Sequence, residues 1–272
     1  MARRYLIGDV SRILGLARET LRYYERCGIV VPWKDPETGY RYYDPVQINH
    51  LMLCKMYRQM GMSSAEICDL IDREGSEGKR ELLLRKCEEL RREIRWKQMV
   101  LEAVERLEGQ YEEFGTKVGN CYEEEQEAAA VVLHQWDDVF SRSRGLGETV
   151  HAWLSHTPVV YHAAFFEREL LQRGECAIVW GFYCQLQQAR ELGLDRMEGV
   201  RIKEACRCLC RVVELREGER VGAEHFEPLL RQARERGLEI GDDARGVSII
   251  TGRVKGYARR LQKLSLPVTE GR

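Results

Sequence analysis

The chain has 272 residues, and at about 150 residues per domain this length suggests two domains. Its 43 Lys and Arg residues nearly balance its 44 Asp and Glu residues, so the net charge of −1 excludes a whole-chain bias towards nucleic acid or membrane. No stretch approaches about 18 uninterrupted apolar residues, and the amino terminus lacks the apolar segment of a secretion signal. We therefore expect a cytoplasmic protein with no membrane partner.

The first 60 residues carry a local positive charge, because ten basic side chains face six acidic ones and leave +4. Apolar residues at helical spacing over 7–14 and again around Leu21 predict two short helices, with Gly15 breaking the pattern between them. The prolines, glycine and tyrosines of 31–44 predict a hairpin instead. The result would be a helix-turn-helix followed by a wing.

Two further helices are predicted before residue 75. Apolar residues return to helical spacing from Pro45 to Tyr57. Ser63 and Glu66 then have the spacing of a capping box, which predicts a short helix that runs to about Asp72.

Residues 77–114 have the pattern of one long helix. Its apolar residues recur in steps of four and three, while its other positions carry charges of both signs, as in a coiled coil with a solvated back. About 38 helical residues span roughly 57 Å, more than one small core can cover. We therefore predict that this helix pairs with another helix; the alternative is a solitary helix. The predicted seam holds Leu83, Cys87, Leu90, Ile94, Lys97, Leu101, Val104, Tyr111 and Phe114.

The pattern changes after residue 116, and strand-like runs alternate with helical ones. The strand-like runs are 129–133, 159–166, 177–183, 205–213, 247–252 and 263–268, and the helical runs are 148–154, 185–192 and 224–236. This mixture predicts an α+β domain over 117–272, and the fold class of the whole chain is α+β.

The predicted helix-turn-helix has the chemistry of a DNA-binding module. Its second helix would expose Arg18, Arg22 and Arg26, whose side chains can meet phosphates or guanine edges in the major groove. Tyrosine hydroxyls of the hairpin can bond phosphates. A structural alternative is open at this point, because Tyr23, Tyr24 and Tyr43 can equally be core aromatics and Arg22 a solvated residue.

Four runs of the sequence resemble the MerR family of transcription regulators. They are YLIGDV from Tyr5, TLRYYERCGI from Thr20, DPETGYRYYD from Asp35 and MGMS from Met60. The resemblance covers about the first 70 residues. It implies a winged helix-turn-helix over 1–75, an antiparallel coiled-coil homodimer through a helix over 76–116, and a palindromic promoter with an over-long spacer that the bound regulator distorts for RNA polymerase.

The resemblance also assigns roles to individual residues. It places base and phosphate contacts with double-stranded DNA on the second helix, wing contacts on the hairpin, and further backbone contacts on the third helix. These residues are Arg18, Thr20, Arg22, Tyr23 and Tyr24, then Tyr40, Arg41 and Tyr42, then Lys55 and Arg58.

The carboxy-terminal half resembles the effector domain of BmrR-like multidrug sensors and of gyrase-inhibitor-like proteins. That resemblance implies a cleft for flat, often cationic, organic molecules, with multidrug sensing as its use. Such sensors carry a buried carboxylate on the strand that corresponds to 247–251, where this chain reads VSIIT. We therefore expect a planar effector that is neutral or weakly cationic. The candidate effector-binding residues are Tyr161, Phe165, Trp180, Phe182 and Glu204, although the aromatics can equally form ordinary core.

Two other functions stay open for this half of the chain. Glu204, Cys206, Cys208 and Cys210 alternate, so an extended chain would point them to one face, where the thiols can bind a soft metal, react with an electrophile or fill the core. Some gyrase-inhibitor-like domains hydrolyse small molecules, but the missing carboxylate argues against an enzyme here. We expect no catalytic residue, no metal site and no cofactor.

Overall fold

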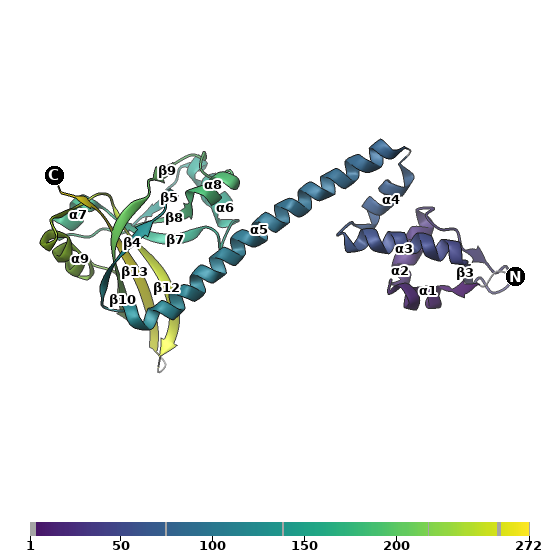
Figure 1. Ribbon diagram of the computed structural model, residues 1–272, viewed down its shortest axis with the longest axis horizontal. Helices are drawn as coiled ribbons and strands as arrows, with labels where there is room; N and C mark the ends of the chain where they lie inside the picture. The colour runs from purple at the N-terminus through teal and green to yellow at the C-terminus, as the bar shows by residue number, and fades with distance from the viewer. Residues whose placement is uncertain (1–3, 74, 138, 217, 255–256, 272) are drawn as a thin grey trace. The chain divides into compact units, whose positions relative to one another are not determined.

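The computed structural model describes residues 4–73, 75–137, 139–216, 218–254 and 257–271 (Figure 1). The chain forms two compact units, unit 1 from Met1 to Arg95 and unit 2 from Trp96 to Arg272. Unit 1 is mostly helical, and unit 2 combines a large sheet with helices. The predicted α+β class, with a helix-turn-helix, a long helix and a sheet domain in that order, is confirmed. The first three residues and Glu74 of the predicted 1–75 domain lie outside the described residues.

Unit 1 contains the predicted helices and hairpin. Its elements are β1 (Tyr5–Leu6), α1 (Ile7–Leu14), α2 (Arg18–Arg26), β2 (Trp33–Lys34), β3 (Arg41–Tyr43), α3 (Pro45–Gln59), α4 (Ser64–Asp72) and the first part of α5 (Ser76–Lys117). The strands form a small antiparallel sheet in the order β1-β3-β2. Strand β1 was not predicted, because two residues are too few to show alternation.

Local sequence signals set the helix ends in unit 1. Gly15 follows α1 with φ +60, a conformation that glycine adopts without strain. Ser63 and Glu66 form the predicted capping box of α4, and Asp44 and Gln47 form another at the start of α3. The helices enclose one core, whose fully buried members are Val10, Leu21, Tyr24, Tyr43, Leu51, Cys54 and Ile67.

We expect Asp44→Ala to lower the free energy of unfolding by about 1 kcal/mol. The Asp44 carboxylate accepts a hydrogen bond from the Gln47 backbone N–H at 2.8 Å, and the Gln47 side chain accepts one from the Asp44 N–H at 3.1 Å. Urea denaturation measures the change. Asp44→Asn keeps the acceptor and should recover most of the loss, whereas equal midpoints for the wild type and the alanine variant would contradict the role of this cap.

Unit 2 is built on an antiparallel sheet. Its elements after α5 are β4 (Cys121–Gln126), β5 (Ala129–Trp136), β6 (Val139–Phe140), α6 (Arg144–Leu154), β7 (Tyr161–Phe166), α7 (Arg168–Gln172), β8 (Val179–Gln185), α8 (Leu186–Glu191), β9 (Val200–Lys203), β10 (Cys206–Arg216), α9 (Ala223–Glu235), β11 (Leu238–Ile240), β12 (Ala244–Val254) and β13 (Tyr257–Glu270). The described strands run in the order β4-β10-β13-β12-β7-β8-β5-β6, with β9 beside β5 and β11 beside β13. All six predicted strands and all three predicted helices of this half are present.

The two faces of this sheet have different coverings. On one, the helix face, Phe166 and Leu209 pack with Phe226 and Leu229 of α9, while Phe182 packs with Trp153 of α6 and Met99 of α5. On the other, the open face, the buried cluster consists of strand residues alone among those described. Its members are Val131, Ala163, Phe165 and Val179, with Leu133, Tyr183 and Val247 packed against them. No helix of the described residues therefore packs against this buried cluster of the open face.

Candidate functional site

Helix α2 presents arginines to solvent. Leu21 and Tyr24 are both fully buried and lie three residues apart, so they hold one side of the helix against the core. Arg18, Arg22 and Arg26 recur every four residues on another side and are exposed. This arrangement leaves three guanidinium groups available to a polyanion.

Three of the predicted DNA contacts on α2 are fully or partly buried. Tyr24 has no exposed surface, and burial raises the pKa of its hydroxyl, so its prediction as a DNA contact is corrected: it is a core residue. Tyr23 is half-buried, with its ring 5.6 Å from the Arg26 guanidinium carbon. Thr20 is also half-buried, and both it and Tyr23 stay accessible in part.

A single carboxylate joins α2 to the hairpin. Glu25 receives the Lys34 ammonium at 2.8 Å and the Arg41 Nε at 2.6 Å. Burial alone would raise the pKa of Glu25, but the hydrogen bonds from Lys34 and Arg41 outweigh it and lower that pKa. The predicted wing residue Arg41 therefore fixes the hairpin to the second helix.

The hairpin carries aromatic and basic groups at its surface. Tyr40 is 62% exposed, and the Tyr42 ring lies 5.6 Å from the Trp33 ring. The guanidinium carbon of Arg4 lies 4.4 Å from the centroid of the Trp33 ring, within the range of a cation–π contact. The sequence prediction missed Arg4, Trp33 and Lys34. Trp33 could have been found, because pairing across the predicted hairpin places it opposite Tyr42.

The two predicted backbone contacts of α3 are differently engaged. Lys55 donates a hydrogen bond to the Leu14 carbonyl at the end of α1, which makes it a cap of that helix. Arg58 is exposed and donates to the Ser64 hydroxyl at 2.7 Å. Of the two, Arg58 is the more available to a phosphate.

The predicted aromatic wall of unit 2 divides between the two faces of the sheet. Register pairs Tyr161 with Tyr183 and Phe165 with Val179, so these four residues share the open face. Trp180 pairs with Ala164 and Phe182 with His162, on the helix face. The prediction that Tyr161, Phe165, Trp180 and Phe182 line one pocket is therefore corrected, because side chains of neighbouring residues alternate across a strand.

The open face holds a stack of two tyrosines between two arginines. The Tyr161 and Tyr183 rings are 5.1 Å apart and nearly parallel. Arg106 of α5 lies over Tyr161 at 5.1 Å, and Arg245 of β12 lies over Tyr183 at 4.1 Å. Each of the two rings thus has one neighbouring ring and one neighbouring guanidinium. Tyr183, Arg106 and Arg245 were missed by the sequence prediction.

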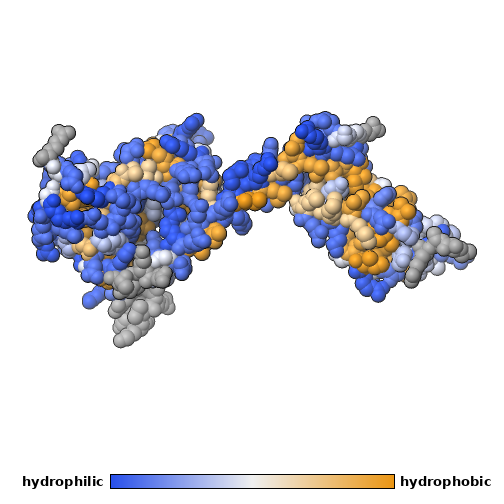
Figure 2. All heavy atoms as spheres, viewed as in Figure 1, coloured by the Kyte–Doolittle hydropathy of each residue, from blue (hydrophilic) through white to orange (hydrophobic). Residues whose placement is uncertain are grey.

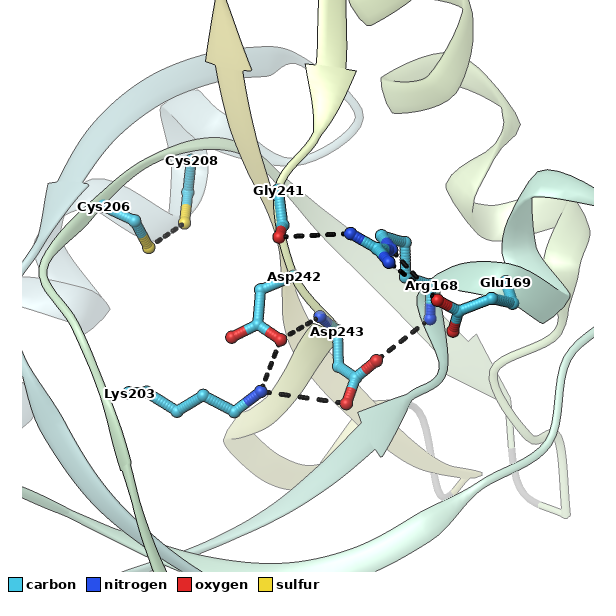
Figure 3. Close-up of polar contacts among 8 residues, drawn as sticks. All are labelled: Arg168, Glu169, Lys203, Cys206, Cys208, Gly241, Asp242 and Asp243. Carbon is cyan, nitrogen blue, oxygen red and sulfur yellow. Dashed lines mark hydrogen bonds and ion pairs between the residues drawn. The ribbon is translucent and has the colours of Figure 1, made fainter.

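A cavity of about 330 Å³ adjoins this stack at Arg245. Val131 and Phe165 supply apolar parts of its lining, and Cys206 also lines it. The Lys203 Nζ, on β9, lies 2.6 Å from a carboxylate oxygen of Asp242 and 3.7 Å from one of Asp243, and all three residues line the cavity (Figure 3). The size suits a small organic ligand.

Glu204 does not lie on a strand. It falls in the connection between β9, which ends at Lys203, and β10, which begins at Cys206. Its side chain is exposed and forms part of the cavity lining. The expectation that Glu204 shares an extended strand with the cysteines is therefore wrong, while Glu204 stays a candidate effector-binding residue in the loop before β10.

The three alternating cysteines share the open face, as predicted. The sulfurs of Cys206 and Cys208 are 3.7 Å apart (Figure 3), and the Cys210 thiol donates to the Ser265 hydroxyl at 3.5 Å. The hydrogen bond with Cys208 lowers the pKa of Cys206, and the charge of Arg245 acts in the same direction. Among the described residues no group of three or more His, Cys, Asp or Glu side chains is arranged to hold a metal ion.

No helix in the described part of the chain has the length and apolar character needed to cross a membrane.

With this geometry in place, comparison with known proteins defines the amino-terminal domain. Residues 5–74 match the model of the MerR HTH family regulatory protein. Similar proteins include the HTH-type transcriptional regulator CueR of Escherichia coli, 38% identical over 24% of this chain and 49% of that protein. Another is the multidrug-efflux transporter 1 regulator of Bacillus subtilis, 38% identical over 23% of each chain. Residues 5–74 thus form a MerR-family helix-turn-helix domain.

The family model ends at residue 74, before unit 2 begins at Trp96. The chain spans about half the length of CueR. A solved EcmrR–DNA complex covers 98% of this chain at 18% identity and a TM-score of 0.37.

Proposed function

We propose that the protein is a homodimeric, ligand-responsive transcription regulator that binds promoter DNA. The observation that carries the proposal is the surface of α2 in a MerR-family domain, where Arg18, Arg22 and Arg26 are exposed beside a hairpin held by Glu25. Phosphate contacts from such a surface supply affinity, and arginines at base edges supply specificity. The proposed division of labour is 1–75 for DNA, 76–116 for dimerisation and 117–272 for the effector.

The described surface of α5 supports dimerisation. Its predicted seam residues are exposed along the helix in the single chain, with Ile94, Leu101 and Val104 each more than half exposed. Apolar side chains also reach the surface of α3 at Met52, Leu53 and Met56 and just after it at Met60, and Figure 2 shows apolar surface on unit 1 in orange. Apolar residues that recur at heptad spacing are buried when two helices pair. The Phe114 side chain, also predicted in the seam, lies outside the described residues.

In the proposed mechanism the effector acts on DNA geometry. A regulator of this kind sits on a palindromic promoter whose spacer is over-long, and effector binding in unit 2 favours a dimer that bends and untwists the site for RNA polymerase. The cavity and the tyrosine stack of the open face support a small planar organic effector. In this proposal the carboxy-terminal unit senses the ligand and does not convert it.

We expect Arg22→Ala to weaken binding to a palindromic promoter fragment by about 1 to 3 kcal/mol. Its guanidinium is held 3.0 Å from Glu19 on the exposed side of α2, ready to exchange that partner for a base edge. Mobility shifts at one fixed salt concentration measure the loss. Arg80→Ala removes an arginine with the same type of ion pair, to Glu77 on α5, and serves as the control.

Two results decide the DNA-binding proposal in that experiment. The promoter fragment must bind more tightly than random DNA of the same length. Equal affinity for both, or equal losses in Arg22→Ala and Arg80→Ala, would contradict specific recognition by α2.

A further inference from the structure

We propose that Cys206 is a site of covalent modification, at which its thiolate adds to small alkenes conjugated to a carbonyl group. The inference goes beyond the proposed function, because covalent chemistry at this thiol does not depend on DNA binding. Three features of the open face carry it: a pair of thiols, a nearby guanidinium group and an adjoining cavity.

The pair of thiols places its proton on one of the two sulfurs. Cys206 and Cys208 lie two residues apart on β10, so their side chains point to the same face, with their sulfurs 3.7 Å apart (Figure 3). Cys208 has no exposed surface, whereas Cys206 is half-buried. Burial disfavours a thiolate, so Cys208 keeps its proton and its S–H donates to the Cys206 sulfur. The pair therefore presents its nucleophile at the accessible position.

A guanidinium group adds a favourable charge to the Cys206 thiolate. Arg245 of β12 acts in this direction, while Asp242 and Glu125 oppose it with smaller effects. The bonded partner of Arg245 is neutral, because its guanidinium donates to the Gln126 side-chain oxygen at 2.8 Å. The hydrogen bond within the thiol pair outweighs burial and, together with Arg245, lowers the pKa of Cys206 to about 7.

The lowered pKa distinguishes Cys206 from other accessible cysteines. A thiol attacks fastest when its pKa is close to the ambient pH, because a higher pKa leaves it protonated and a lower one weakens the nucleophile. Burial raises the pKa of Cys121, and it raises that of Cys176 to about 11. Cys87 is exposed on α5 and provides the internal reference for reactivity. Near neutral pH, Cys206 combines access with thiolate character.

The cavity gives a small compound a place beside this sulfur. Cys206 belongs to its lining, and Val131 and Phe165 supply apolar parts of the same lining. A volume of about 330 Å³ accommodates a compound of one or two rings. An electrophile with an apolar ring can therefore be held next to the thiolate before it reacts.

The reaction needs no further reagent. The Cys206 sulfur forms a bond to the β-carbon of the alkene, and the electron pair of the C=C bond moves to the carbonyl oxygen. Arg245 and Lys203 are cations of the cavity lining, and their charge favours the enolate that forms. Water then protonates the α-carbon, which balances the proton that Cys206 lost to solvent when it became a thiolate.

The test measures the rate of labelling at each cysteine of the full-length protein. A limiting amount of N-phenylmaleimide is added near neutral pH, and peptide mass spectrometry follows the label with time. We expect Cys206 to react about tenfold or more faster than Cys87. Unsubstituted maleimide lacks the ring, so the ratio between the two rates should be several-fold smaller with that probe.

Variants assign the reactivity to the neighbours of Cys206. Cys208→Ala removes the hydrogen-bond donor and Arg245→Gln removes the charge, so each should slow the labelling of Cys206 by about fivefold or more near neutral pH. At about pH 10 Cys206 is a thiolate in every variant, and the wild-type rate should return. Cys210→Ala is the matched control, because it removes another buried thiol from the same strand and face, one that donates to Ser265 at 3.5 Å.

Four outcomes would overturn the inference. They are labelling of Cys206 that is no faster than labelling of Cys87, unchanged rates in both Cys208→Ala and Arg245→Gln, an equal loss in Cys210→Ala, and slow labelling of the two variants that persists at high pH. An equal ratio of rates with the two maleimides would overturn the role of the cavity. The proposed function fails separately, through equal affinity for promoter and random DNA in the mobility-shift experiment.

Discussion

The paired substitution Ile94→Glu and Leu101→Glu is expected to give a monomer and to lower the affinity for a palindromic operator by about 100-fold or more. The two side chains are 57% and 55% exposed in the single chain and lie seven residues apart, at the same position of successive heptads. In a dimer they would be buried, so two carboxylates would have to lose their hydration there. A monomer contacts only one half of the palindrome through its single α2. It therefore lacks the second α2 that a dimer holds at high effective concentration near the other half-site.

Sedimentation velocity and mobility shifts measure both effects. Arg85→Glu and Arg92→Glu form the control pair, because these exposed residues are also seven apart but lie outside the seam. The control introduces at least as much negative charge and should remain a dimer. A dimeric seam variant with unchanged operator affinity would show that α5 does not carry the interface.

Unit 1 could be predicted almost element by element because its signals are local. The helix ends depend on Gly15, Asp44 and Ser63, each of which acts on residues no more than a few positions away. The core position of Tyr24 also follows from a local signal. Tyr24 comes three residues after Leu21, and this spacing places both side chains on the buried side of α2. The sequence offered that spacing, but the family pattern favoured the other role.

The site in unit 2 could be predicted only in part, for a reason of geometry. Alternation within a strand shows which of its residues share a face, and it correctly separated Tyr161 and Phe165 of β7 from their neighbours. Alternation does not show which residues of β8 lie on the same face as Tyr161 and Phe165, because that depends on the register between β7 and β8. The register pairs Tyr161 with Tyr183, and Trp180 and Phe182 therefore point to the helix face.

The arginines of the stack illustrate a second limit. Arg106 lies on α5, a helix that its periodicity marks as a dimerisation element, and Arg245 lies on β12, far along the chain. Only tertiary structure brings both to the Tyr161–Tyr183 pair. Polar residues that meet across such separations leave no spacing in the sequence from which to find them.

Acid should destabilise unit 2 through His134. This ring is 7% exposed on the helix face, lies 4.9 Å from Phe182 and 5.9 Å from Phe140, and has no hydrogen-bond partner for either nitrogen among the described residues. Burial, together with the charge of the nearby His162, lowers the pKa of His134 from 6.5 to about 4. The folded state therefore favours the neutral ring, while the unfolded chain binds a proton at higher pH.

The sign of the effect follows from that order of pKa values. As the pH falls from 6.5 to about 4, protons bind to the unfolded chain first, so the wild type should lose on the order of 3 kcal/mol of unfolding free energy relative to a variant without this group. His134→Phe keeps an aromatic ring between Phe140 and Phe182 and removes the titration. Urea denaturation across this pH range measures the difference, and His151→Phe, at an exposed position of α6, controls for the loss of one histidine. Parallel pH profiles for the wild type and His134→Phe would contradict this prediction. They would mean that protonating His134 in the folded state costs no free energy of unfolding.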